Sequence, residues 1–147
     1  MAHWESYSAA ESNDIFDQFG LPLQRMAWAL HKLSNPESPG QGHMRSVQDA
    51  LKVLINLKEW LLQGDKSFYE VTYTKGLYTQ ETIQLLDEFK AGLDKTLEVL
   101  GSIADTDTNS AMIPVKKLYS EFLLFARTWI REFHPVSGGI LSDNFQL

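Results

Sequence analysis

Cysteine is absent from the 147 residues of this chain. Without a thiol, the chain can form no disulfide, offer no thiolate nucleophile and bind no zinc or iron–sulfur cluster through sulfur. Proline and glycine are also sparse, at five and nine residues. Two of each fall within residues 34–42, which predicts a loop there.

Long apolar runs are missing as well. No segment approaches the ~18 consecutive apolar residues that a membrane-spanning helix needs. The first residues, MAHWESYSAAESND, have neither the basic start nor the apolar stretch of a secretory signal. We therefore expect a cytoplasmic protein that makes no membrane contact.

Basic residues are fewer than acidic ones. The chain has 13 lysines and arginines against 19 aspartates and glutamates, a formal net charge of −6. This balance argues against phosphate-driven binding of nucleic acid or of an anionic membrane, and it is compatible with a basic protein partner. With 44% hydrophobic and 22% charged residues, the composition is typical of one soluble globular domain with a substantial core.

Motifs of specific chemistry are also missing. The sequence has no glycine-rich phosphate loop, no nucleophile elbow and no histidines paired at metal-ligand spacing. Asp105, Asp107 and Asn109 copy the first three ligand positions of a calcium loop, but Ser110 and Lys116 replace its glycine and its final glutamate. We therefore predict no metal site, no cofactor and no small-molecule substrate.

Apolar residues recur at helical spacing in four long segments. The sequence thus predicts an all-α fold, with a bundle of four main helices in a single domain over residues 1–147. Residues 1–11 are expected to form a flexible arm and residues 136–147 a flexible tail. Aromatic and β-branched residues alternate with polar ones near residues 67–75, which predicts a short extended or hairpin segment. The main helices are expected to begin near Pro22, Ser46, Thr79 and Ser110, after a short helix that Gly20 ends.

Basic side chains gather on one side of the last helix. At about 100° per residue, they project roughly 100–160° from the centre of its apolar face, so they share a solvent-side stripe. Two tryptophans lie at or beyond the edge of the apolar stripes of their own helices, and aromatic residues in such positions are enriched at interfaces. The predicted partner-binding residues are Lys116, Arg127, Arg131, His134, Trp28 and Trp60.

Arg127 and His134 stand seven residues apart in the stretch FARTWIREFHP. This R-x6-H spacing resembles the motif of the HEPN family of α-helical ribonucleases. The resemblance implies a dimer that cleaves RNA without metal, with Arg127 stabilising the phosphate charge and His134 acting as the acid–base residue. Thr128 stands where that family usually has asparagine or aspartate, and Pro135 directly follows the histidine.

The preferred interpretation is a non-enzymatic protein–protein interaction module, such as an adaptor, an inhibitor or an assembly subunit, that binds another protein or itself. Two alternatives stay open. One is a HEPN-like ribonuclease that uses Arg127 and His134. The other is a self-assembling structural subunit, because the extended segment near residues 67–75 would have an unpaired edge.

Overall fold

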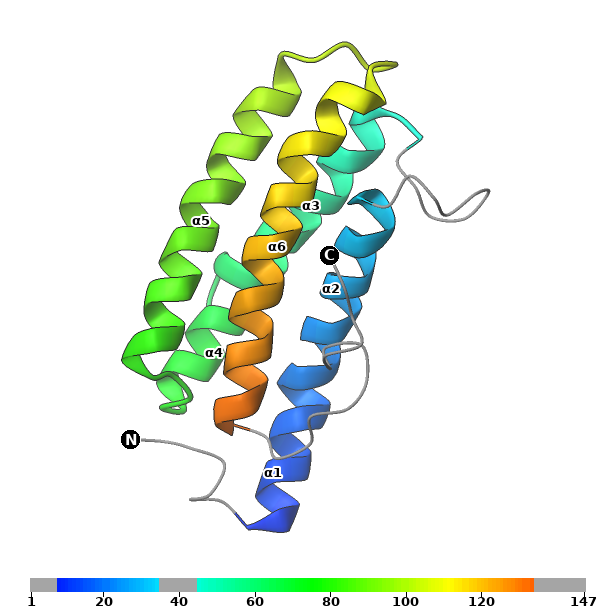
Figure 1. The fold of residues 1–147 in the computed structure, drawn as a ribbon. Helices are drawn as coiled ribbons and strands as arrows, with labels where there is room; N and C mark the ends of the chain where they lie inside the picture. The colour runs from blue at the N-terminus through cyan, green and yellow to red at the C-terminus, as the bar shows by residue number, and fades with distance from the viewer. Residues whose placement is uncertain (1–7, 35–44, 134–147) are drawn as a thin grey trace.

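The computed structural model describes residues 8–34 and 45–133, and every regular element in these ranges is helical. The elements are α1 (Ala9–Ile15), the π-helix η2 (Phe16–Gly20), α2 (Leu21–Ser34), α3 (Val47–Leu62), α4 (Phe68–Thr74), α5 (Gln80–Gly101) and α6 (Thr108–Phe133). The prediction of an all-α fold is confirmed. The expected count of four main helices is not confirmed: α4 is a further helix that contacts α3, and α1 and η2 lead directly into α2 (Figure 1). No helix in the two described ranges is long and apolar enough to cross a membrane.

The N-terminal elements follow one another without a break. At the start of α1, the Glu11 carboxylate accepts a hydrogen bond from the Ser8 N–H (3.0 Å), and Ser8 Oγ accepts one from the Glu11 N–H (3.2 Å). This capping box starts α1 inside the residues 1–11 that we expected to be a flexible arm. Gly20 is the last residue of η2, but it does not break the helical path, because α2 begins directly after it. Residues 1–7 of the arm and the expected tail at 136–147 lie outside the described residues.

The segment expected to be extended is a helix instead. Ser67 caps α4 by accepting a hydrogen bond from the Glu70 N–H at 3.2 Å. Phe68 and Thr72 are both buried, because residues four apart share one side of a helix. The prediction of an extended or hairpin segment at residues 67–75 is therefore wrong. The strand edge that supported self-assembly does not exist in this segment.

Two of the predicted helix starts are confirmed by their caps. Ser46 Oγ accepts a hydrogen bond from the Asp49 N–H at the start of α3. At the start of α5, Thr79 and Thr82 form a reciprocal capping box. The first N–H groups of a helix have no partner within the helix, so these hydroxyl groups supply one.

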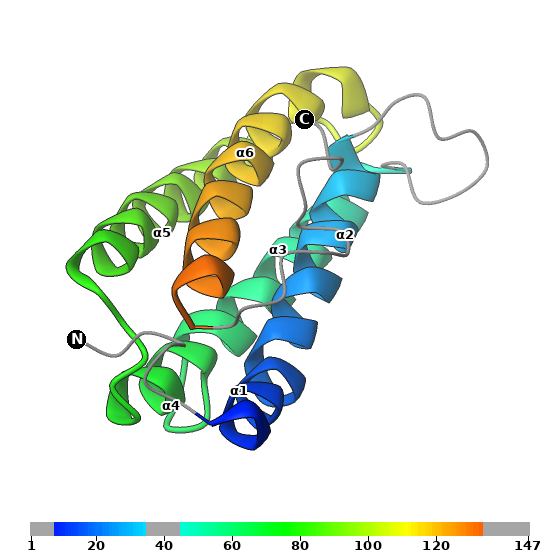
Figure 2. The same ribbon diagram turned by 60° about the horizontal axis from the view of Figure 1, so that its bottom comes forward.

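α6 is the central helix of the fold. It runs between α5 and α2 in both views, with α3 behind it (Figure 1 and Figure 2). Because it has neighbours on several sides, it buries more than the single stripe that the sequence predicts. Its buried residues are Ala111, Val115, Leu118, Tyr119, Phe122, Leu123, Phe125, Ala126, Thr128, Trp129 and Ile130.

Gly92 in α5 offers a stabilising substitution. A Cβ at this position would lie 2.6 Å from Glu121 Oε1, the end of a flexible side chain that can rotate away. Alanine is more stable than glycine inside a helix by about 0.5–1 kcal/mol, so we expect Gly92→Ala to raise the free energy of unfolding in a urea titration by about that amount. Gly64 is the matched control. Its φ of +87° disfavours a side chain, so Gly64→Ala should lower the free energy of unfolding. Loss of stability in Gly92→Ala would show that Glu121 is held in place.

Candidate interaction surface

The basic residues predicted on the last helix fall on one side of α6. Lys116 and Arg131 are exposed, and Arg127 is half-buried. At about 100° per residue, these three positions lie within one narrow sector of the helix. His134 lies outside the described residues, so the structure does not place it relative to Arg127.

Two large apolar side chains are exposed on this same side. Ile113 is 76% exposed and Leu124 is 54% exposed, and neither was among the residues predicted from the sequence. The sequence alone could have indicated them. Successive spacings of four, seven and seven residues separate Ile113, Lys117, Leu124 and Arg131, and such spacings keep residues on one side of a helix. We define the α6 stripe as five exposed residues: Ile113, Lys116, Lys117, Leu124 and Arg131.

The α6 stripe combines three cations with two aliphatic side chains. The Arg131 guanidinium lies 4.0 Å from Glu81 Oε1 on α5, and the two side chains are 66% and 61% exposed. Ion pairs this exposed contribute little to stability. Arg131 can therefore exchange Glu81 for a carboxylate of a partner at small cost.

Arg127 lies in the same sector of α6 but is half-buried, so it is less exposed than the sequence predicted. Burial raises the pKa of Tyr119 above that of an ordinary phenol, and the positive charge of Arg127 opposes this rise. The Tyr119 ring lies 5.6 Å from the ring of His31 on α2, and burial lowers the pKa of His31. Arg127 is therefore electrostatically coupled to a residue packed between α6 and α2.

The two predicted tryptophans have different surroundings. Trp28 on α2 is 43% exposed, stacks on His31 at 5.3 Å between ring centroids, and has Lys32 Nζ 5.7 Å above its ring. Trp60 on α3 is half-buried and packs against Phe68 at 5.2 Å. Trp28 thus presents aromatic surface to solvent, whereas Trp60 belongs mainly to the edge of the core.

Asp105 and Asp107 of the calcium-like sequence lie in the connection between α5 and α6, where they accept hydrogen bonds from backbone N–H groups. The Asp105 carbonyl accepts a hydrogen bond from the Val47 N–H (3.0 Å), and its carboxylate accepts one from the Gln48 N–H (2.8 Å). The Asp107 carboxylate accepts one from the Ser110 N–H at 3.2 Å. These carboxylates cap α3 and α6. Across residues 8–34 and 45–133, no three histidine, aspartate or glutamate side chains are grouped as metal ligands would be.

Comparisons with protein-family models, with curated proteins and with solved structures give no significant match for this chain. The function must therefore be inferred from the chemistry of the surfaces themselves.

Proposed function

We propose that this protein is a non-enzymatic interaction module that binds an acidic surface of a partner protein through the α6 stripe. The observation that carries the proposal is the exposure of Ile113 and Leu124 among lysine and arginine side chains. Full burial of an aliphatic side chain of this size contributes about 1.5–3 kcal/mol. The cations around it would orient the partner and raise the association rate.

A protein partner fits this surface better than a phosphate polymer does. Nucleic acids and anionic membranes are bound through broad positive fields, whereas this chain has a net charge of −6 and only three cations on the stripe. Ile113 and Leu124 also require apolar surface to cover them, which a protein supplies. Trp28, exposed on α2, is a second aromatic contact available to such a partner.

Charge reversal on the stripe tests the proposal. We expect Lys116→Glu combined with Arg131→Glu to weaken capture of the partner from the native host by about tenfold, and more than either change alone. Both cations act through the same local field, so added salt should mimic the change. Lys52→Glu combined with Lys66→Glu is the control, since it changes the net charge equally at two exposed positions outside the stripe.

Two results would contradict the proposal. One is equal capture by both double variants, since the stripe would then contribute nothing to binding. The other is cleavage of single-stranded RNA by the purified protein in the presence of a chelator. If His134→Ala and Arg127→Ala each abolished that cleavage without changing the circular dichroism spectrum, the roles implied by the HEPN resemblance would be assigned instead.

A further inference from the structure

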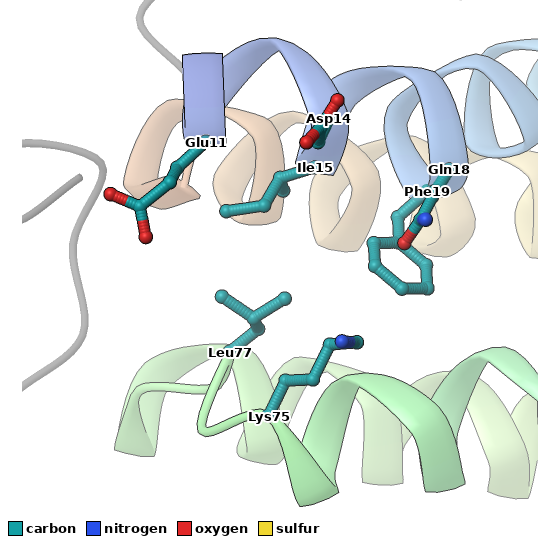
Figure 3. A pocket seen from close by; sticks show the side chains of 7 residues that line it. All are labelled: Glu11, Asp14, Ile15, Gln18, Phe19, Lys75 and Leu77. Atoms are coloured by element: carbon teal, nitrogen blue, oxygen red, sulfur yellow. The ribbon is translucent and has the colours of Figure 1, made fainter. Parts of the chain in front are cut away.

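A cleft lies between α1–η2 and the connection from α4 to α5 (Figure 3). Its volume is about 280 Å³. Ile15 and Phe19 line one wall, Leu77 lies opposite, and all three are almost completely buried. The cleft therefore has an apolar floor, although it opens to solvent.

The floor is held in place before anything binds. Phe19 belongs to η2, and π-helical turns are rare and often occur at functional sites. On the other wall, Gly76 at φ +76° and the hydrogen bond from the Leu77 N–H to the Thr72 carbonyl (2.9 Å) end α4 in a Schellman turn. The Leu77 carbonyl in turn accepts a hydrogen bond from Trp129 Nε1 at 2.9 Å. The cleft is therefore preformed.

The rim of the cleft carries charge of mainly one sign. Glu11 and Asp14 project from α1, and Lys75 projects from the opposite wall. Hydrogen bonds from Ser8 lower the pKa of Glu11, so this carboxylate is ionised at neutral pH. The volume of about 280 Å³ is near the lower end of the ~300–1,000 Å³ of ordinary small-molecule sites, so the cleft has room for an aliphatic side chain. The cleft thus fits an aliphatic side chain accompanied by cations that face α1.

The chain itself presents that combination. Among the described residues, Ile113 is the most exposed large apolar side chain. Lys116 and Lys117 follow three and four residues later and are also exposed, so they lie one turn along the same side of α6. Ile113 thus has the size for the apolar floor, and the two lysines have the charge for the rim.

The two surfaces lie at opposite ends of the bundle. The first turns of α6 are at one end, and α1 and the connection from α4 to α5 are at the other (Figure 1 and Figure 2). A molecule therefore cannot insert its own Ile113 into its own cleft, but a second molecule can. An interface between two different surfaces is heterologous, so it repeats head to tail into a ring or an open filament.

We propose that Ile113 of one copy docks in the cleft of the next copy, with Lys116 and Lys117 beside Glu11 and Asp14. This inference rests on the proposed function, because it uses part of the α6 stripe and names a second copy as the partner. The contact is small, so assembly should require high protein concentration and low salt.

Sedimentation velocity over a concentration series up to about 1 mM tests the inference. The average mass of the wild type should rise above that of the monomer. Lys116→Glu combined with Lys117→Glu should stay monomeric, and so should Asp14→Lys combined with Gln18→Lys. Glu11 is left unchanged, because it caps α1. Each variant reverses the charge of a different surface, so an equimolar mixture brings opposite charges together at both contacts and should assemble again.

The double variant Lys52→Glu with Lys66→Glu should assemble like the wild type, and circular dichroism confirms that each variant is folded. A wild type that stays monomeric overturns the inference. So does a mixture of the two monomeric variants that fails to assemble. Neither result bears on the proposed function, which fails only if reversal of Lys116 and Arg131 leaves capture of the host partner unchanged or if the RNA assay shows cleavage.

Discussion

Replacing Trp129 with alanine is expected to lower the free energy of unfolding by about 3–5 kcal/mol. Trp129 is fully buried on α6. Its ring centroid lies 5.2 Å from that of Phe68 on α4 and 6.3 Å from that of Phe19 on η2. This one side chain therefore packs between three elements that are distant in sequence. No one of these elements could alone fill the cavity that the alanine variant would leave.

Trp129→Phe separates the packing from the hydrogen bond. Phenylalanine keeps an aromatic ring but cannot donate to the Leu77 carbonyl, which Trp129 Nε1 contacts at 2.9 Å. An unsatisfied buried carbonyl costs about 1–3 kcal/mol, so this variant should have an intermediate loss. Urea unfolding followed by circular dichroism measures both variants. A loss below about 1 kcal/mol for Trp129→Ala would contradict the central position of α6.

The long helices could be predicted from the sequence because their local signals agree with one another. Ser46 and Thr79 were expected to start helices and do cap α3 and α5. Phe89 and Leu93 lie four residues apart on the apolar side of α5, and both are fully buried. Caps and apolar spacing are properties of neighbouring residues, so they are visible without knowledge of the tertiary structure.

The helix α4 could not be predicted in this way. Over seven residues, the alternation of aromatic and polar side chains satisfies a strand pattern, and a short segment has too few turns to show a helical period. Tertiary packing determines that this segment is a helix. Phe68 fills a space between Phe19, Trp60 and Trp129, with ring centroids 5.2–5.9 Å away. Those partners come from η2, α3 and α6, so the local sequence does not reveal them.

The candidate surfaces were only partly visible from the sequence for the same reason. The basic positions Lys116 and Arg131 could be placed on the solvent side of a helix from their spacing alone. Arg127 shares their sector, but its coupling to buried Tyr119 depends on how α2 packs against α6. The cleft in Figure 3 needs α1, η2 and the connection from α4 to α5 together, and no spacing rule relates these segments.

Phe122→Ala should also lower the free energy of unfolding by about 3–5 kcal/mol. The Phe122 ring is fully buried and lies 5.2 Å from that of Phe89 on α5 and 6.4 Å from that of Phe125. It is part of the packing between the two longest helices. Leu93→Ala on α5 should cost about 2–5 kcal/mol for the same reason.

Leu124→Ala is the matched control, two residues from Phe122 on the same helix. Leu124 is 54% exposed, so its truncation should change the free energy of unfolding by no more than about 0.5 kcal/mol. Urea titrations of the three variants therefore report which way α6 faces. If Leu124→Ala cost more than Phe122→Ala, the helix would be rotated. Ile113, Lys117 and Arg131 would then lie against the core, and the α6 stripe could not bind any partner.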